Sequence, residues 1–515
     1  MKKNKLLAII ALFIISNAAS QTTFHKTISS GHLSNVIATT DGNYLTGINN
    51  NGIAGIELIK FNSTGDTLWT KIFTDPSDNP IIRQIIQTED SGFAVCGFLQ
   101  GNFFLFLMKT DKYGNLSFYK QFDDTLVGTY QNVSIAETSG GSFVLSGGAT
   151  SAFTYDDGFI IYTDNTGDIL WSNKYGTNSD YEDVSRLIIT HDDFFLMAGT
   201  ANSHAILSKT DSQGNILWWR QYNPVFANGY EVKETLGNGC IIIGNSGNSI
   251  IALKTDSSGI VSWCKGYSKN PVSLQAVSIT PTNDSGFVFL SSAGSPVNDL
   301  FLIKTNSMGD TLWTHAYGTD STDAAHNGYF YSGSILETNS GDLVFTGETK
   351  LSSIQFLSAI IRTDANGNTC EGYRPAGLDS VYNINVAVTN SAISSWDNFN
   401  NIIPSTLIMA SPNYSPVITN FCLGTGSENT IAEDQDIFIY PNPSNGDCFV
   451  SISPEQNDNF NFLVVNNSLG EQIIEYDLRK GVNIIKITAV PSGIYFYAVF
   501  RKNKIAQRGK ILISR

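Results

Sequence analysis

The chain has 515 residues, which at about 100–200 residues per domain allows about two to four domains. Its 31 Lys and Arg against 46 Asp and Glu give a net charge of −15, and so acidic a chain excludes nucleic acid as a general partner. Hydrophobic residues at 42% and aromatic residues at 11% exclude a disordered chain.

The first 20 residues have the three parts of a secretory signal peptide. Three lysines within the first five residues form a basic start, the apolar run Leu6–Ile15 follows, and small residues precede a cleavage site between Ser20 and Gln21. The alternative is a buried N-terminal strand, which the basic flank disfavours. No later apolar run approaches the length of a membrane-spanning helix, so we predict an exported chain with no transmembrane segment in its mature form.

Seven hairpin signatures recur through the middle of the chain. Each has Asp or Asn followed three positions later by Gly, with an apolar strand before the turn and usually a Trp strand after it. The Asp or Asn side chain opens the turn by accepting backbone N–H groups, and Gly takes the left-handed conformation. The turn glycines, 45 to 58 residues apart, are Gly65, Gly114, Gly167, Gly214, Gly259, Gly309 and Gly367.

Two more short strands precede each hairpin, and the nearer one usually ends in Gly, as in Phe93–Gly97. Four short strands in about 50 residues, in seven copies, predict an all-β fold in which residues 21–370 form a seven-bladed β-propeller. The seventh unit lacks its aromatic strand, and Phe24–Ile28 aligns with Trp69–Phe73. We therefore expect the N-terminal strand to complete the seventh blade and close the ring, which removes the open sheet edge. The alternative is a linear β-solenoid.

The hairpins resemble the tryptophan-docking repeats of quinoprotein-type propellers, which share an Asp, a Gly and a Trp at this spacing. The resemblance covers the turn only. Burying an indole removes about 150–250 Å² from water, which is sufficient reason for Trp at these positions without a ligand. We therefore interpret the repeated residues as structural. The structural repeat tryptophans are Trp69, Trp171, Trp218, Trp263 and Trp313.

Function in a propeller is expected where the blades differ, in the loops of one face and at the mouth of the central channel. The irregular stretches are Tyr155–Asp157, Asn178–Asp183, Trp219–Arg220 and Asp320–Tyr331. The acidic Asn178–Asp183 stretch lacks the spacing of a calcium loop, so we favour a solvated loop over a cation site. Arginine is scarce in the propeller, which disfavours a site built to bind anions.

The sequence nominates no catalytic, cofactor-binding or metal-ligating residue. The six histidines form no His-Glu-x-x-His pair, and no Gly-x-Ser-x-Gly, dinucleotide-binding or P-loop motif occurs. A glycosidase with paired carboxylates stays open as an alternative, because two acidic residues can meet from distant blades.

Residues 371–430 are rich in Asn, Ser and Pro and predict a connector, with a few strands laid on the propeller. Cys370 and Cys422 flank this segment and form a candidate disulfide. In an exported protein it would close a loop of about 50 residues and contribute about 3–4 kcal/mol. Cys96 and Cys240 are expected to be small buried apolar residues.

Residues 431–515 predict a small β-sandwich of short alternating strands. Its motif positions are Tyr440, Pro441, Asn442, Pro443, Gly446, Gly470, Gly493 and Tyr495. These motifs closely resemble the type A C-terminal sorting domain of the type IX secretion system of Bacteroidota. The resemblance implies the type IX secretion machinery as a partner, removal of the domain, and release or attachment at the cell surface. The alternative is an adhesive β-sandwich.

Two functional interpretations follow. The first is a non-catalytic surface or secreted module whose propeller binds a glycan or protein ligand. The second is an exported polysaccharide-active or quinoprotein-like enzyme. The regular blades, the scarce arginines and the missing catalytic motifs favour the first interpretation.

Overall fold

The computed structural model divides into two compact units, Met1–Gly424 and Thr425–Arg515, which we call unit 1 and unit 2. The described residues of unit 1 are 23–28, 31–49, 55–74, 78–101, 104–123, 129–150, 157–176, 182–202, 204–223, 228–293, 300–317, 333–352, 355–369, 374–375, 378, 380–383, 387–389, 394–396, 403–406 and 418–420. Those of unit 2 are 437–440, 447–452, 460–466, 472–478, 481–486, 490–491, 493–501 and 504–513. Every regular element among them is a β-strand, so the predicted all-β class is confirmed.

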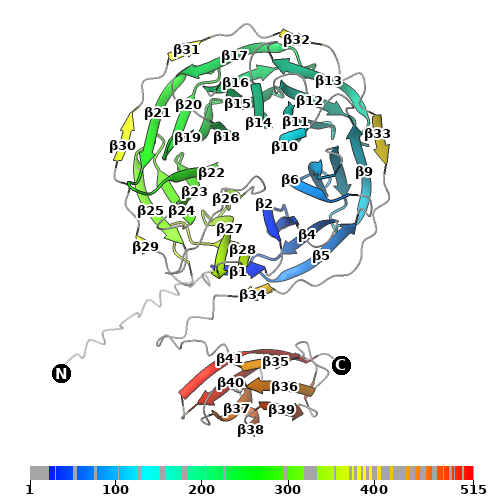
Figure 1. The fold of residues 1–515 in the computed structure, drawn as a ribbon, viewed down its shortest axis with the longest axis vertical. Helices are drawn as coiled ribbons and strands as arrows, with labels where there is room; N and C mark the ends of the chain where they lie inside the picture. The colour runs from blue at the N-terminus through cyan, green and yellow to red at the C-terminus, as the bar shows by residue number, and fades with distance from the viewer. Residues whose placement is uncertain are drawn as a thin grey trace, which may run out of the picture. The chain divides into compact units, whose positions relative to one another are not determined.

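The described residues of unit 1 form seven antiparallel sheets, which Figure 1 shows set around a common centre. We number them sheet 1 to sheet 7 by their innermost strands. These innermost strands are β2 (His32–Ala38), β6 (Pro80–Gln87), β10 (Thr129–Glu137), β14 (Glu182–Ile189), β18 (Asn228–Glu234), β22 (Leu274–Pro281) and β26 (Ile335–Glu337). The second strands are β3 (Tyr44–Asn49), β7 (Phe93–Leu99), β11 (Phe143–Thr150), β15 (Phe195–Ala201), β19 (Cys240–Ser246), β23 (Phe287–Ala293) and β27 (Leu343–Ser352).

The two outer positions of each sheet are filled in the same order. The third strands are β4 (Gly55–Phe61), β8 (Leu105–Thr110), β12 (Asp157–Thr163), β16 (His204–Thr210), β20 (Ser249–Thr255), β24 (Leu300–Thr305) and β28 (Gln355–Arg362). The fourth strands are β5 (Thr67–Thr74), β9 (Leu116–Asp123), β13 (Ile169–Gly176), β17 (Ile216–Asn223), β21 (Val261–Ser268), β25 (Thr311–Tyr317) and, in sheet 7, β1 (Phe24–Ile28). Strand β1 pairs with β28 along its whole length, so the N-terminal strand completes the last sheet.

Short strands from residues 374–420 add a fifth strand to the outer edge of six sheets, and we call this segment the strap. Its strands are β29 (Arg374–Pro375) beside β25, β30 (Ser380–Asn383) beside β21, β31 (Ala387–Thr389) beside β17, β32 (Ser394–Trp396) beside β13, β33 (Ile403–Thr406) beside β9 and β34 (Ile418–Asn420) beside β1. The strap therefore passes the sheets in reverse order, from sheet 6 to sheet 2 and then to sheet 7, along the outside of unit 1 (Figure 1).

The hairpin turn that the sequence predicts seven times is confirmed. All seven turn glycines have φ between +76° and +82°, a left-handed conformation that other residues resist. In each turn the Asp or Asn side chain accepts the backbone N–H two residues on, as Asp111 Oδ1 does from Tyr113 N at 2.8 Å. The turn is therefore built from local residues, which is why its sequence signature is so regular.

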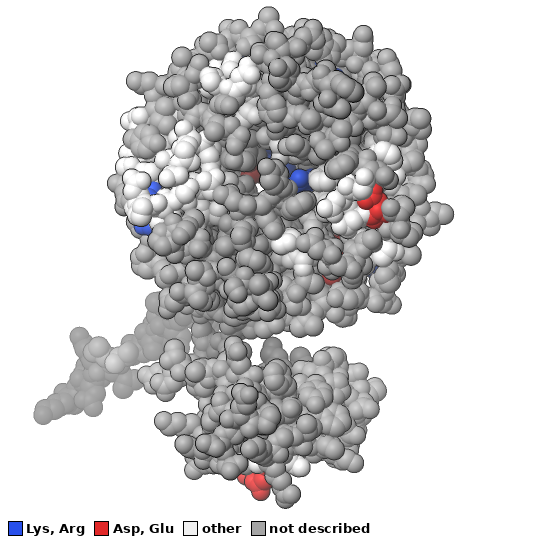
Figure 2. Space-filling view, viewed as in Figure 1, with Lys and Arg blue, Asp and Glu red and all other residues white. Residues whose placement is uncertain are grey.

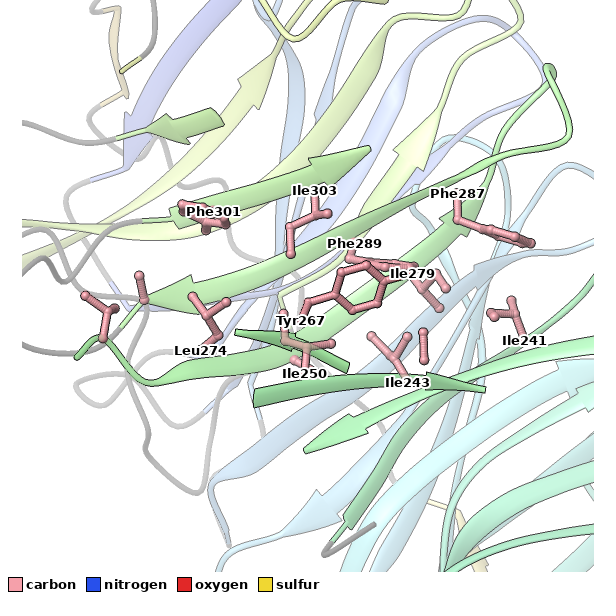
Figure 3. Packing of buried hydrophobic residues seen from close by; sticks show 14 of the residues in the cluster. Ile241, Ile243, Ile250, Tyr267, Leu274, Ile279, Phe287, Phe289, Phe301 and Ile303 are labelled. Carbon is pink, nitrogen blue, oxygen red and sulfur yellow. The ribbon is translucent and has the colours of Figure 1, made fainter. Parts of the chain in front are cut away.

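A separate hydrophobic cluster fills each boundary between consecutive sheets. Between sheets 5 and 6, the rings of Tyr267 and Phe289 meet edge to face with centroids 5.2 Å apart, and Figure 3 shows Ile243 and Leu274 beside them. Six more clusters join sheets 1–2, 2–3, 3–4, 4–5, 6–7 and 7–1. Each sheet therefore has two apolar faces, and a neighbouring sheet covers each of them. Because this leaves few solvent-facing positions, the share of charged residues is low.

An aromatic ring on the fourth strand of each sheet covers the turn glycine of the next sheet. A methyl group added to that glycine would lie 2.8–3.1 Å from the ring. The pairs are Phe24–Gly65, Trp69–Gly114, Phe118–Gly167, Trp171–Gly214, Trp218–Gly259, Trp263–Gly309 and Trp313–Gly367. In four sheets a Tyr four positions after the Trp also donates its hydroxyl to the carbonyl of that glycine, at 2.7–2.8 Å: Tyr175, Tyr222, Tyr267 and Tyr317.

This docking contact predicts unequal effects for two glycines that have the same backbone conformation. Gly42 and Gly309 both have φ +77°, but nothing lies within 4 Å of a Cβ at Gly42, whereas Trp263 Cη2 would lie 2.9 Å from a Cβ at Gly309. We expect Gly42→Ala to cost only the backbone strain of about 1–2 kcal/mol. Gly309→Ala should cost about 1–3 kcal/mol more, because the indole must shift. Denaturant unfolding of both variants measures the difference, and equal losses would contradict the docking contact.

Unit 2 is a two-sheet sandwich in its described residues. One sheet contains β35 (Ile437–Tyr440), β36 (Asp447–Ile452) and β39 (Gly481–Lys486), and the other β38 (Gln472–Asp477), β37 (Phe460–Asn466), β40 (Gly493–Arg501) and β41 (Lys504–Ile513). Its core contains Leu463, Val465, Tyr495, Val499 and Ile511. The small β-sandwich predicted for this part of the chain is what the structure contains.

Candidate functional site

The innermost strands carry a repeated irregularity that positions a polar side chain. In the first six of them the register shifts by a β-bulge near the middle of the strand. A polar residue lies at or directly after the bulge, and Ser334 holds the same place just before β26. We call these seven positions the belt: Asn35, Gln84, Ser134, Arg186, Glu231, Ser278 and Ser334.

Six belt side chains each accept a hydrogen bond from a backbone N–H of the next sheet. The bonds are Ile85 N to Asn35 Oδ1 at 2.8 Å, Ile135 N to Gln84 Oε1 at 2.9 Å, Leu187 N to Ser134 Oγ at 2.9 Å, Ile279 N to Glu231 Oε2 at 2.9 Å, Ile335 N to Ser278 Oγ at 3.3 Å and Val36 N to Ser334 Oγ at 2.7 Å. The last of them joins sheet 7 to sheet 1. Each bond satisfies an amide that the bulge releases from its own sheet.

The link from sheet 4 to sheet 5 is the exception, because Arg186 is a donor and not an acceptor. Its guanidinium Nη2 lies 3.8 Å from Glu231 Oε1, and its Nε is buried without a hydrogen-bond partner. Among the described residues, no side chain accepts a hydrogen bond from Val232 N, the amide that corresponds to Ile85 N and Leu187 N. Lys233 Nζ lies 2.9 Å from Glu231 Oε1. Arg186 and Lys233 thus place two cationic donors beside one carboxylate.

The carboxyl of Glu231 at this link is held in its ionised form. Burial raises the pKa of the Glu231 carboxyl, but Lys233, Arg186 and a hydrogen bond from Ser278 outweigh that effect and hold it below its ordinary value. Burial also lowers the pKa of Arg83, on the innermost strand of sheet 2, to about 10, so it stays charged at neutral pH. Figure 2 shows a hollow in the middle of unit 1 in which basic and acidic atoms are visible.

Arginine was expected to be too scarce in unit 1 for an anion site, and the structure shows why that expectation is incomplete. Four arginines occur between residues 24 and 369, and two of them, Arg83 and Arg186, lie on innermost strands. Both influence the thiol of the buried Cys96, whose pKa burial raises to about 12. The sequence shows how many arginines this part of the chain has, but only the fold shows that two of them lie on innermost strands.

Most other charged residues of the ring are committed to the framework. In five sheets a cation on the third strand pairs with an Asp in the turn between the first two strands: Lys60–Asp41 at 2.7 Å, Lys109–Asp90 at 2.7 Å, Lys209–Asp192 at 2.9 Å, Lys304–Asp284 at 2.8 Å and Arg362–Asp342 at 2.7 Å. Burial raises the pKa of Asp90, but hydrogen bonds from Lys109 and Thr88 outweigh it and lower the value to about 2. Because these pairs recur, they support the fold and do not mark a ligand site.

Glu57, on β4, is a buried acid in an otherwise apolar position. The corresponding residues of the other sheets are Phe106, Phe159, Ile206, Ile251, Phe301 and Ala359. Glu57 is 2% exposed, and neither carboxyl oxygen has a hydrogen-bond partner. It lies on the same strand face as Ile59 and Phe61, which pack against sheet 7. Burial raises its pKa from 4.5 to about 7.

Glu57→Leu is therefore expected to stabilise the protein, and more so at high pH. The carboxyl is neutral in both states well below pH 4.5, and between pH 4.5 and about 7 the unfolded chain ionises while the folded chain resists. Wild-type stability thus falls over this window, and above it the cost is about 3 kcal/mol. Denaturant unfolding at about pH 5 and about pH 8 should show that Glu57→Leu gains more stability over the wild type at the higher pH. The Glu57→Gln variant should lack the fall in stability that the wild type shows between these pH values. An equal gain at both pH values would contradict this account.

The structure places only part of the irregular stretches that the sequence singled out. Tyr155, Asp156, residues 178–181 and residues 320–331 lie outside the described residues, as do the side chains of Asp157, Glu182 and Asp183. Trp219 is buried in the cluster between sheets 3 and 4, and Arg220 donates from Nε to Ser258 O at 2.6 Å. Trp219 and Arg220 therefore belong to the framework of the ring.

Several other predicted residues also fall outside the described part of the chain. They are Ser20 and Gln21 at the signal cleavage site, Cys370 and Cys422 of the candidate disulfide, and Pro441, Asn442, Pro443, Gly446 and Gly470 of the sorting motifs. Of the remaining motif residues, Tyr440 ends β35, Gly493 begins β40, and the buried Tyr495 donates its hydroxyl to Pro491 O at 2.9 Å. Cys96 and Cys240 are buried free cysteines.

Within the described residues, no three His, Cys, Asp or Glu side chains stand close enough together to hold a metal ion. The described chain also has no helix of a length and apolarity suited to crossing a membrane.

Comparison with known proteins identifies the C-terminal part of the chain. Residues 438–514 match the secretion system C-terminal sorting domain, which covers unit 2 from β35 to β41. The motif positions read from the sequence lie inside this match. The protein is therefore exported by the type IX secretion system to the cell surface or beyond. A search of the curated proteins finds no relative of the chain.

Solved structures give only distant likenesses. A protein of unknown function from Bacteroides caccae is 11% identical, with 57% of this chain and 94% of that chain covered and a TM-score of 0.36. The extracellular domain of a putative hybrid two-component system of B. thetaiotaomicron is 12% identical, with 95% and 59% covered and a TM-score of 0.41, so this chain spans under two thirds of it. The polysaccharide lyase Uly1 is 10% identical, with 65% and 90% covered and a TM-score of 0.40. Likenesses at this level carry no argument about function.

Proposed function

We propose that residues 24–369 form a closed seven-bladed β-propeller that serves as a non-catalytic binding module for a glycan or protein ligand on the cell surface or outside the cell. Export is what the sorting domain requires, and a rigid ring suits a protein that presents a fixed binding surface. The closed ring is supported by contacts between residues about 300 positions apart. These include the bond from Val36 N to Ser334 Oγ at 2.7 Å and that from Ser358 Oγ to Gly31 O at 2.7 Å.

The observation that carries the binding function is the break in the belt at Arg186. Six of the seven links use a neutral or acidic side chain to hold the next sheet, and this structural role accounts for those six residues. The seventh places Arg186, Glu231 and Lys233 at the centre, where the charges cost desolvation and close no comparable amide bond. Such an irregularity in a repeated framework is where a ligand site is expected.

A glycan and matrix-protein array probed with the purified full-length protein tests this function. We expect saturable binding to one ligand class, with the mass of the bound ligand unchanged after long incubation. Cleavage or oxidation of a polysaccharide on the array would favour the alternative, an exported polysaccharide-active or quinoprotein-like enzyme. Absence of binding across the array would contradict the proposed function.

A further inference from the structure

We infer that the link between sheets 4 and 5 binds a carboxylate group of the ligand, held by the guanidinium of Arg186 and the ammonium of Lys233. This inference rests on the proposed function and specifies its ligand as an acidic one. The ligand class is a carboxylate-bearing molecule, either a free organic acid or an acidic sugar such as a uronate within a polysaccharide.

The first argument is the missing acceptor. At each of the six regular links an oxygen atom lies opposite a released amide, at 2.7–3.3 Å. At the seventh link the donor Arg186 occupies the acceptor position, so this link forms no such bond from side chain to amide. Arg186 can instead donate to an acceptor from outside the chain, and a carboxylate is such an acceptor.

The second argument is that Glu231 cannot fill this role. One of its oxygens, Oε2, already accepts the bond from Ile279 N at 2.9 Å, and the other lies 2.9 Å from Lys233 Nζ. The distance from Arg186 Nη2 to Glu231 Oε1 is 3.8 Å, longer than a hydrogen bond. Arg186 therefore keeps donor capacity in spite of its acidic neighbour, and its Nε makes no hydrogen bond.

The third argument is that solvent reaches the donors. The side chain of Arg186 is 18% exposed and that of Lys233 is 38% exposed, whereas that of Glu231 is 4% exposed. A ligand that approaches this link from solvent therefore meets the two cations, while the carboxylate stays buried. Since a planar guanidinium pairs with a carboxylate through two parallel hydrogen bonds, carboxylate is the anion that best fits Arg186.

The charge of the rest of the protein sharpens this selectivity. The chain carries −15 overall, so an acidic ligand is repelled from most of the surface and is drawn only to a local positive site. At this link Arg186 and Lys233 against Glu231 leave a local excess of positive charge. Binding should therefore weaken as salt is added, because the attraction is electrostatic.

The test is calorimetric titration of the full-length protein with matched acidic and neutral probes. D-Glucuronate, oligogalacturonate and acetate are the acidic probes, and D-glucose and neutral galacto-oligosaccharide are the matched neutral ones. We expect one or more acidic probes to bind, in the millimolar range for the monomers, and the neutral probes not to bind at this site. Binding of acetate as strongly as the sugars would identify a free organic acid as the ligand. Preference for oligogalacturonate would identify an acidic polysaccharide.

Arg186→Ser is the decisive variant, because Ser is the residue that three regular links already use. We expect it to weaken binding of the acidic probe at least about tenfold while the melting temperature stays the same or rises, since a hydroxyl can now accept from Val232 N. Arg220→Ser removes a cation from the outer strand β17 and should bind the probe as the wild type does. Arg186→Lys keeps the charge but loses the paired hydrogen bonds, so it should bind with intermediate affinity.

Two outcomes would overturn the inference. One is failure of every acidic probe to bind the wild-type protein. The other is an Arg186→Ser variant that melts lower and binds unchanged, which would make Arg186 a structural residue. If the array still shows a neutral glycan or protein ligand in either case, the proposed binding function survives. Failure of both the probes and the array would remove the binding function as well.

Discussion

Deleting residues 431–515 is expected to abolish display of the protein on the surface of intact cells and to leave it in the periplasm. The type IX machinery recognises the sorting domain, and residues 438–514 match this domain. Because the ring is a separate compact unit, the truncated chain should still fold. Surface labelling of intact cells, followed by fractionation, measures the result. Unchanged surface display of the truncated chain would contradict the export account.

Two point variants in one strand provide a matched control for this deletion. Tyr495 is buried in the core of unit 2 and bonds Pro491 O, whereas the adjacent Phe496 is exposed. We expect Tyr495→Ala to destabilise the domain by about 3–5 kcal/mol and to reduce display strongly. Phe496→Ala should leave display near the wild-type level. Equal display of the two variants would show that export does not depend on the folded domain.

Removing the N-terminal strand Phe24–Ile28 is expected to destroy the cooperative unfolding of the ring. This strand is the fourth strand of sheet 7, buries Phe24 and Ile28, and places Lys26 3.5 Å from Asp66 of sheet 1. The loss of Phe24 alone should cost about 3–5 kcal/mol. Residues 1–20 are retained in this variant so that export is unaffected. Thermal unfolding followed by circular dichroism should show a broad transition at lower temperature.

The strap supplies the control for this strand deletion. Strand β30 (Ser380–Asn383) also pairs at the outer edge of a sheet, but it lies beside a sheet that already has four strands. Deleting these four residues should lower the stability far less. A synthetic peptide with the sequence of residues 22–30 should restore the sharp transition of the variant that lacks β1. Identical unfolding of both deletions would contradict the role of β1 in the ring.

The parts of the fold that sequence reasoning predicted are those set by neighbouring residues. The Asp-x-x-Gly turns appear in the sequence because the side chain of residues such as Asp111 bonds amides only two positions away. The missing aromatic strand of the last unit indicated where Phe24–Ile28 belongs, and the pairing with β28 agrees. Because each turn is formed by neighbouring residues, the same residue types recur in every copy of the turn and can be seen in the sequence.

The parts that sequence reasoning missed depend on contacts between distant residues. Ser134 is an ordinary serine until the fold brings it to Leu187 N, and the belt has no fixed residue type, since Asn, Gln, Ser and Glu all serve as acceptors. Arg186 was counted as one of few arginines, but its significance comes from occupying an acceptor position. The Tyr four residues after the repeat Trp, such as Tyr267, could have been noticed from the spacing alone.

The belt also allows the closed ring to be tested at a single atom. Site-resolved hydrogen exchange of the full-length protein compares the amide of Val36, which links sheet 7 to sheet 1, with the amides of Ile135 and Ile279. These two amides link sheets that follow one another in the sequence. In a closed ring all three open only when the ring unfolds, so Val36 N–H should exchange as slowly as the other two. An amide of Val36 that exchanges rapidly while Ile135 and Ile279 stay protected would show an open ring and contradict the propeller.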